Sequence, residues 1–264
     1  MLPIIAIPLA AVLGLFAGGF ANAGIMRTKE TLSFTANRKC SMCAHPMHGH
    51  DTLPIVGYLG LRGRCRKCKA VIPWQYLMTE VAMAGLFALF AWRAFTLFGA
   101  PIEVEASEAI LLFARDAGVS FFLVLIFMFD WRASVIPDRL SIPAMFIALL
   151  ANILLGMPAT DVLLGGLLIG SFFAMQFFLT RGQWVGGGDI RMGLLMGFLL
   201  GPWVGIAALL LSYIFGALVG IFLIATGRRQ LSSHVPFGTF MAVAILICML
   251  AGAPIVDLYI KALT

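Results

Sequence analysis

The chain has 264 residues, of which 61% are hydrophobic and only 11% charged. A soluble globular protein of this size cannot bury so much apolar surface, so the composition predicts an all-α polytopic membrane protein. The formal net charge is +6, from 18 Lys and Arg against 12 Asp and Glu. We attribute this basic excess to membrane topology and to contact with anionic membrane lipid, and we expect no nucleic-acid partner.

The first predicted element is an apolar run over residues 2–22. It has no basic segment before it and no convincing small-x-small cleavage site after it, so we expect a retained transmembrane helix and not a cleaved signal peptide. The chain then divides into three predicted parts: a first transmembrane helix at 1–22, a cytoplasmic domain at 23–75 and a transmembrane domain at 76–264.

The segment 23–75 is strongly basic, with nine Lys and Arg residues against two acids. Short loops rich in Lys and Arg stay in the cytoplasm, so this segment is predicted to be cytoplasmic. The same orientation places the acidic loop that contains Glu103, Glu105 and Glu108 on the opposite side of the membrane.

Two CxxC pairs lie in this basic segment, Cys40-Ser41-Met42-Cys43 and Cys65-Arg66-Lys67-Cys68. Two such pairs can give four thiolates to a tetrahedral Zn²⁺, with Cys40, Cys43, Cys65 and Cys68 as the ligands. A pair of disulfides is the alternative, but a cytoplasmic location is reducing. A zinc ion would fold a small domain that has no core of its own. Three nearby histidines are alternative ligands: His45, His48 and His50.

Seven further apolar runs follow the basic segment, which gives about eight transmembrane helices in all. The long run after residue 190 exceeds one bilayer thickness, and we divide it at its one break, Gly201-Pro202-Trp203. The short span before this break is expected to be tilted or re-entrant. The predicted spans lie at residues 76–98, 109–129, 140–157, 161–180, 190–201, 203–226 and 236–252.

Two acids border these spans, Asp130 after the third and Asp189 before the sixth. An acid at a helix centre costs roughly 2.5–3.5 kcal/mol on insertion scales, so acids near membrane depth are functional candidates. Two predicted crossings lie between them, which returns both carboxylates to the same face. Two adjacent carboxylates share a proton, and such a pair can act as acid and base in peptide hydrolysis.

Three glycines precede Asp189, and Gly186 and Gly188 would let an extended substrate backbone approach without a Cβ in the way. Structural roles are the alternative for both acids. Asp189 would then be a helix N-cap, and Asp130 an interfacial charge at a helix end. A proton-coupled transporter would use the same acids as a proton relay, and a non-catalytic membrane scaffold would keep only the zinc domain.

The ordered set of motifs resembles the type IV prepilin peptidases, a family of GxGD intramembrane aspartyl proteases. The segment Gly186-Gly187-Gly188-Asp189 is similar to the GxGD signature, and Asp130 with Ile136-Pro137-Asp138 to the family's first acid motif. Val235-Pro236-Phe237-Gly238 resembles a late IPFG box, and the CxxC pairs resemble the zinc domain of the longer members.

This resemblance implies cleavage of prepilins and pseudopilins at the cytoplasmic face of the bacterial inner membrane, with Asp130 and Asp189 as the catalytic acids. Gly186, Gly188, Asp138 and Arg191 would belong to the active-site loops; the family's usual lysine after GxGD is Arg191 here. Asp138 follows a proline at a helix start, so we expect it to shape the loop and to hold Arg139 or the substrate leader.

Bifunctional members of the family also methylate the new N-terminus with S-adenosylmethionine as donor, so the resemblance implies possible N-methyltransferase activity. The family's first motif is only partly kept here, since the usual serine is absent. The candidate residues for this second activity are Asn22, Arg27 and Glu80.

Overall fold

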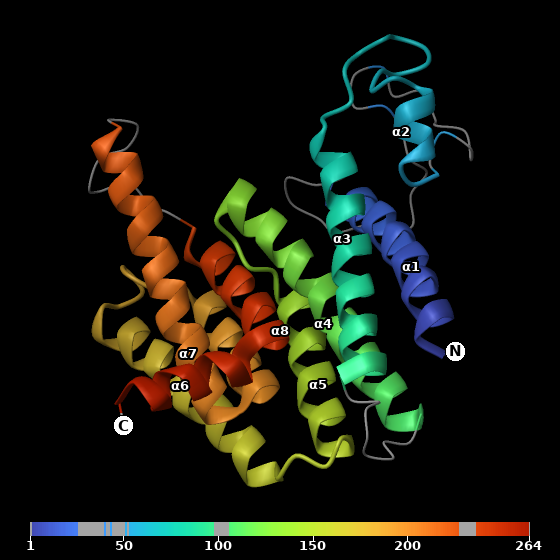
Figure 1. Ribbon diagram of the computed structural model, residues 1–264. Helices are drawn as coiled ribbons and strands as arrows, with labels where there is room; N and C mark the ends of the chain where they lie inside the picture. The colour runs from blue at the N-terminus through green and yellow to red at the C-terminus, as the bar shows by residue number, and fades with distance from the viewer. Residues whose placement is uncertain are drawn as a thin grey trace. The chain divides into compact units, whose positions relative to one another are not determined.

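The structure is a computed structural model that describes residues 2–25, 40, 43, 51, 53–97, 106–226 and 236–263. These residues are largely helical, with one isolated antiparallel bridge, Arg64 to Val71, in the described part (Figure 1). The chain forms two compact units, Met1–Phe113 and Ala114–Thr264. An all-α architecture, as the composition predicted, is confirmed.

The first unit is built around two long helices, α1 (Leu2–Ile25) and α3 (Gln75–Trp92), which pack against each other. A short helix α2 (Val56–Gly60) precedes α3, and a π-helical turn η2 (Arg93–Leu97) follows it. On α1, Gly14 and Gly18 let the two backbones approach closely, because a Cβ at Gly18 would lie 2.6 Å from the Glu80 Cα. Small residues four apart are typical of helix pairs in membranes.

The second unit contains most of α4 (Ala106–Ala133), whose first turns belong to the first unit. It continues with α5 (Asp138–Leu154), α6 (Ala159–Leu179), α7 (Gly187–Ala225) and α8 (Phe237–Leu263). Helix α7 packs against α5, α6 and α8 and is the centre of this unit. Glycines at facing positions of α6 and α7 bring these two helices into backbone contact, Gly165 against Gly197.

Helix α7 bends sharply at Gly201, where φ is 71° and ψ is −174°. Such angles are outside the helical region and favour glycine. The next residue is Pro202, which has no N–H to continue the helix. The break predicted at Gly201-Pro202-Trp203 is therefore confirmed, and α7 consists of two helical halves.

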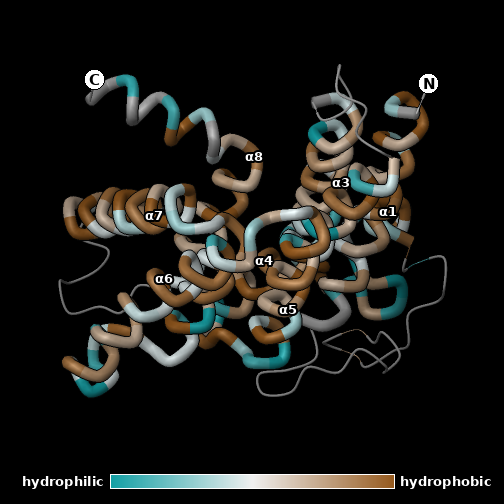
Figure 2. The backbone as a smooth tube through the Cα atoms, turned by 90° about the horizontal axis from the view of Figure 1, so that it is seen from below, coloured by the Kyte–Doolittle hydropathy of each residue, from teal (hydrophilic) through white to brown (hydrophobic). Residues whose placement is uncertain are grey.

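Five helices of the described part are long and apolar enough to cross a membrane, so the chain is a multi-pass membrane protein. Figure 2 shows that hydrophobic residues dominate the long helices. A further apolar helix, Phe237–Gly252, is shorter. The predicted count of eight spans stays a prediction, because α5 has only 17 residues and the two halves of α7 together have only 39. The five helices are Pro3–Asn22, Gln75–Thr96, Ala106–Ala133, Ala159–Leu179 and Gly187–Ala225.

Candidate active site and metal centre

Asp130 lies in the last turn of α4 and is only 4% exposed. Its Oδ2 accepts a hydrogen bond of 2.8 Å from the backbone N–H of Thr239. Thr239 is in the first turn of α8, where backbone N–H groups have no helical acceptor and the helix dipole favours a negative charge. The start of α8 thus holds the Asp130 carboxylate at the end of α4.

Asp189 lies in the first turn of α7, and its Oδ2 accepts a 2.9 Å hydrogen bond from the Gly186 N–H. In return, the Asp189 N–H donates to the Gly186 carbonyl oxygen at 3.0 Å. Gly186 is the N-cap residue, so Asp189 stands three residues inside the helix and its carboxylate fastens the glycine loop to the first turn. The suggested alternative of Asp189 as the N-cap residue itself is wrong.

The structure brings Asp130 and Asp189 to the same end of the second unit, around the side chain of Ile136. The side chain of Ile136, in the turn between α4 and α5, contacts the start of α7 and the start of α8. A Cβ at Gly188 would lie 2.8 Å from the Ile136 Cβ, and one at Gly238 would lie 2.7 Å from the Ile136 Cδ1. Glycines at both positions therefore allow α7 and α8 to close on this residue.

Asp138 begins α5 and forms an ion pair with Arg191 of α7, with 2.6 Å between Oδ1 and Nη2. The expected partner of Asp138 was Arg139 or the substrate leader; in the described residues its ion-pair partner is Arg191 instead of Arg139, and contact with the leader stays a prediction. Within the described residues, the Arg191 Nε–H is buried without a hydrogen-bond partner. The ion pair links α5 to α7 two residues beyond Asp189.

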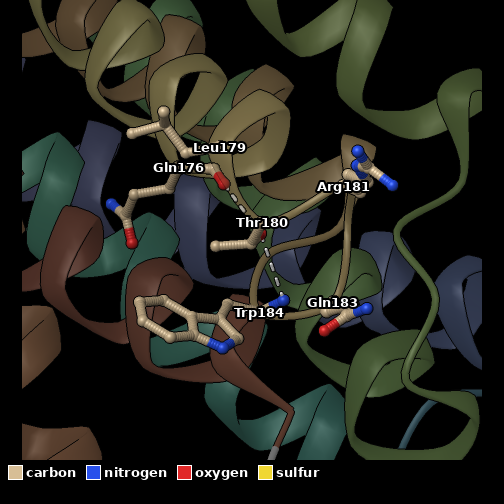
Figure 3. A pocket seen from close by; sticks show the side chains of 6 residues that line it. All are labelled: Gln176, Leu179, Thr180, Arg181, Gln183 and Trp184. Atoms are coloured by element: carbon tan, nitrogen blue, oxygen red, sulfur yellow. Dashed lines mark hydrogen bonds between the residues drawn. The ribbon is translucent and has the colours of Figure 1, made fainter.

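A cavity of about 600 Å³ lies at the turn between α6 and α7, directly before the glycine loop (Figure 3). Thr180 orders this turn, because its Oγ1 donates to the Gln176 carbonyl at 2.7 Å and accepts from the Trp184 N–H at 3.4 Å. The cavity thus offers both polar and apolar groups at the turn that precedes the glycine loop. Its lining residues are Gln176, Leu179, Thr180, Arg181, Gln183 and Trp184.

Tyr213, on the second half of α7, is a neighbour of this site that the sequence analysis missed. Its ring lies 4.9 Å from the ring of Phe237, measured between centroids, and its hydroxyl accepts a 3.3 Å hydrogen bond from Gln176. The bend at Gly201 explains this proximity, because it turns the second half of α7 back toward the level of the first.

The four cysteines of the two CxxC pairs form one cluster, with all Sγ atoms within 4.8 Å of one another. The Sγ atoms of Cys40 and Cys68 are 3.7 Å apart, and those of Cys43 and Cys65 are 3.9 Å apart. Four sulfurs at about 2.3 Å from one tetrahedral Zn²⁺ lie about 3.8 Å from each other. The thiols are free and too far apart for disulfides, so the cluster fits a metal ion. The alternative ligands His45, His48 and His50 lie outside the described residues.

Backbone hydrogen bonds shape the second CxxC pair into a tight turn. The Cys65 N–H donates to the Ala70 carbonyl at 2.8 Å, and the Lys69 N–H donates to the Cys65 carbonyl at 3.0 Å. Arg66, which lies between these two cysteines, forms an ion pair with Asp51 at 2.7 Å, and this carboxylate raises the pKa of the guanidinium.

The surroundings of the cluster shift the pKa values of two of its thiols in opposite directions. The backbone N–H groups of Cys68 and Lys67 lower the pKa of the Cys65 thiol. The backbone N–H of Ala70 acts on Cys68 in the same sense, but the Cys43 thiol, burial and the other two thiols together outweigh it and raise the pKa of Cys68 to about 12. Four crowded thiols do not all ionise by themselves, and a bound dication supplies the positive charge that deprotonates them.

The residues suggested for a second activity lie in the first unit, where Asn22 and Glu80 are both buried. The Asn22 side chain donates to the Tyr76 carbonyl at 2.9 Å, and the Glu80 carboxylate accepts a 2.7 Å hydrogen bond from the Ile55 N–H. Ile55 has a φ of 59°, which is strained for a β-branched residue. Arg27 lies outside the described residues.

The chain matches two family models, "Bacterial Peptidase A24 N-terminal domain" over residues 12–94 and "Type IV leader peptidase family" over residues 117–221. It is similar to proteins named "Prepilin leader peptidase/N-methyltransferase". The one from Bacillus subtilis (strain 168) is 31% identical over 255 residues, which are 95% of this chain and 96% of the relative. The one from Pseudomonas putida is 28% identical over 96% of this chain and 93% of the relative. No solved structure matches. Over nearly its whole length, therefore, this chain belongs to the type IV leader peptidase family.

Proposed function

We propose that this chain is an intramembrane aspartyl endopeptidase that removes the leader peptide of type IV prepilins and pseudopilins, with Asp130 and Asp189 as the catalytic acids. The observation that carries this proposal is the convergence of Asp130 of α4 and Asp189 of α7 around Ile136 at one end of the second unit. Gly188, the neighbour of Asp189, faces the Ile136 side chain, and so does Gly238, which also lies against the Asp130 carboxylate. Membership of the type IV leader peptidase family supports the substrate class.

Two interacting carboxylates hold one proton between them, because both cannot carry a full charge at short range. In the reaction, the ionised carboxylate takes a proton from a water molecule, whose oxygen attacks the scissile carbonyl carbon. The protonated carboxyl gives its proton to the carbonyl oxygen, which forms a tetrahedral diol. The C–N bond then breaks: the carboxyl that took the proton from water gives it to the leaving amine, and the other carboxylate takes a proton back from the diol. The backbone N–H groups of Thr239 and Gly186 orient the acids for these transfers.

The glycines of the loop have separate roles in this proposal. Gly186 and Gly187 are exposed, and a Cβ at Gly187 would meet open space, so this part of the loop can face an extended substrate backbone. Gly188 instead faces Ile136, and its role is to let α7 approach the turn between α4 and α5.

The substrate chemistry agrees with a site at a membrane surface. A prepilin has an apolar helix, which can lie among the spans, and a basic leader, which stays in water. We place the site and the cysteine domain on the cytoplasmic side of the bacterial inner membrane, because the basic segment 23–75 follows the positive-inside rule.

The cysteine cluster is proposed to hold one Zn²⁺ through Cys40, Cys43, Cys65 and Cys68, since its sulfur separations fit a tetrahedral site. A four-thiolate site is closed to substrate, so the ion stabilises the fold of the domain and takes no part in hydrolysis.

N-methylation of the new N-terminus, with S-adenosylmethionine as donor, is proposed from the printed names of the relatives. Asn22 and Glu80 form hydrogen bonds to backbone groups, which supports a structural role for both in the methylating half. The described residues give no donor set that would identify where the cofactor binds.

The test is cleavage of a purified prepilin by the detergent-solubilised protein. Asp130→Asn and Asp189→Asn are each expected to lower cleavage by roughly 10³-fold or more, because neither amide can transfer the proton. Both variants should remain folded and keep their metal. Asp138→Asn is the matched control and should keep substantial activity, since its amide oxygen still accepts from Arg191.

Normal cleavage by Asp189→Asn would contradict the protease assignment and would favour a transporter or a scaffold. An inactive Asp138→Asn together with an active Asp130→Asn would contradict only the choice of the first acid.

A further inference from the structure

A second polar cluster is buried in the second unit, away from the catalytic acids. It contains Arg115 and Asp116 of α4 and Asn152 of α5; Asp116 and Asn152 are fully buried. Arg115 donates through Nε and Nη2 to Asp116 Oδ1, at 2.8 and 2.7 Å, and through Nη1 to Asn152 Oδ1. Charged groups inside an apolar helix bundle are costly, so a retained pair is a functional candidate.

The Asn152 side chain extends the cluster to α7. Its Nδ2 donates to the backbone carbonyl oxygens of Phe198 at 2.7 Å and of Leu199 at 2.9 Å. The helical donor for Phe198 would be the N–H of residue 202, which proline lacks, and the bend at Gly201 disrupts the next hydrogen bond as well. Asn152 therefore caps the C-terminal end of the first half of α7.

Each of the three helices runs from the active-site end of the unit to this cluster. Arg115 precedes Asp130 on α4 by about 22 Å of helix axis, and Asn152 follows Asp138 on α5 by about 21 Å. On α7, Phe198 follows Asp189 by about 14 Å. The cluster thus joins the elements that carry Asp130, Asp138 and Asp189 at their opposite ends.

We propose that Arg115, Asp116 and Asn152 form a polar clamp that fixes the axial position of the first half of α7 against α4 and α5. The clamp thereby sets the separation of the Asp130 and Asp189 carboxylates. Its members are positioning residues, because they lie on the far part of each helix from the acids. The inference rests on the proposed function of these two acids.

Hydrogen bonds fix the axial position of a helix better than apolar contacts do, because each bond requires one defined donor and one defined acceptor. Glycine-lined contacts such as Gly165 against Gly197 bring α6 and α7 close, but van der Waals packing alone fixes the sliding of one helix along another weakly. The Asn152 amide reaches two defined carbonyls, and a displaced α7 would leave both without a donor in an apolar environment. Arg115 fixes which way the amide faces, since its Nη1 requires the amide oxygen.

The test is the kinetics of prepilin cleavage by Asn152→Leu, which keeps a similar volume and removes every hydrogen bond of the amide. We expect kcat to fall by about tenfold to 100-fold while KM changes by less than about threefold, because small displacements of catalytic groups cost this much in rate without changing substrate contacts. The affinity for a substrate-derived peptide that carries a hydroxyl in place of the scissile amide should fall by a similar factor, since such a peptide binds to the acid pair.

Ser120→Ala is the matched control. Ser120 is a fully buried polar residue of the same helix α4, and its hydroxyl donates to the Ala117 carbonyl of its own helix. Its removal should leave kcat and the peptide affinity unchanged. The double variant Arg115→Met/Asp116→Leu removes both charges together and frees the Asn152 amide to rotate, so kcat should fall to a value between those of Asn152→Leu and the unmodified protein.

If Asn152→Leu does not yield folded protein, Asn152→Gln replaces it; this variant keeps the amide but shifts it by one methylene, and it should show the same loss of kcat. The clamp is refuted if the folded Asn152 variant has an unchanged kcat, if its loss lies in KM, or if Ser120→Ala loses as much. Failure of the underlying function looks different: Asp130→Asn and Asp189→Asn would then cleave normally, whatever Asn152 does.

Discussion

Gly188 shows how one missing side chain can control the separation of two catalytic groups. A Cβ at this position would lie 2.8 Å from the Cβ of Ile136, a distance at which one of the two segments must move. Ile136 also faces Gly238, whose own Cβ would lie 2.9 Å from the Asp130 Oδ2. A side chain at position 188 would therefore displace Ile136 or the start of α7, and either movement would change the separation of Asp130 and Asp189.

Gly188→Ala is predicted to reduce cleavage by roughly 10-fold to 100-fold, because overpacking of a close contact costs about 1–3 kcal/mol. The measurement is kcat/KM on a purified prepilin, with helical content by circular dichroism as the check on folding. Gly220→Ala is the matched control in the same helix α7, since its Cβ would meet open space, and it should cleave normally. Equal activities of the two variants would contradict the role given to Gly188.

The sequence placed both acids correctly near helix ends but could not predict what holds them. Scarcity of charge singles out Asp130 and Asp189 in an apolar chain, and motif order supports them. The Thr239 N–H, which holds Asp130, and Arg191, which pairs with Asp138, are brought there by helix packing between segments far apart in sequence. Such contacts depend on the rotation of each helix about its axis, which residue types alone do not determine.

The Arg115 and Asp116 pair was overlooked although it had a sequence signal. Both residues lie inside the predicted span 109–129, where adjacent opposite charges are unusual. The sequence analysis considered only acids at the ends of spans, so it did not include Asp116 among the functional candidates. The partner Asn152 carries no charge and was beyond this kind of reasoning, because its importance depends on the carbonyls that Pro202 leaves without a donor.

At the scale of elements, breaks in the chain were easier to predict than the number of crossings. Gly201 and Pro202 interrupt α7 for reasons that are local to the backbone, so residue types suffice. Whether α5 or each half of α7 crosses a bilayer depends on tilt and on neighbouring helices, which apolar runs do not encode. The two CxxC pairs were predictable as a cluster because metal ligation uses a fixed spacing within each pair.

The turn that carries Cys65 and Cys68 is the element most dependent on the metal. Cys65→Ser is predicted to reduce zinc content from about one ion per chain to a small fraction, because a closed site needs its four thiolates. The segment 51–75 should then become sensitive to proteases, since metal binding contributes directly to folding. Elemental analysis and limited proteolysis measure the two effects.

Cys248→Ser is the control for the loss of a thiol, because Cys248 is buried in α8 and does not belong to the cluster. It should keep full zinc content. Absence of metal from the unmodified protein, purified under reducing conditions, would refute the zinc site.

At the scale of the whole molecule, two groups of functional candidates belong to different compact units. The cysteine cluster, Asn22 and Glu80 lie in Met1–Phe113, whereas Asp130 and Asp189 lie in Ala114–Thr264. The two matched family models divide the chain in the same way, at residues 12–94 and 117–221. If the chain methylates as proposed, we expect from this division that methylation and proteolysis have separate structural requirements.

Glu80→Ala is the variant that tests this separation. It removes the acceptor of the Ile55 N–H, and loss of a hydrogen bond to a charged group costs about 1.5–3 kcal/mol. Ile55 holds a strained positive φ, so the segment that precedes the cysteine turn should relax and methylation should fall by at least about tenfold while cleavage is retained. Mass spectrometry of the processed pilin, with S-adenosylmethionine supplied, measures both activities, because cleavage removes the leader and methylation adds one methyl group.

Glu108→Ala is the control for this experiment. It changes an exposed acid of the same unit and should leave both activities unchanged. An unmethylated pilin from the unmodified protein would contradict the proposed methyltransferase activity. A parallel loss of cleavage and methylation in Glu80→Ala would contradict their separation, because the two activities would then depend on the same structural support.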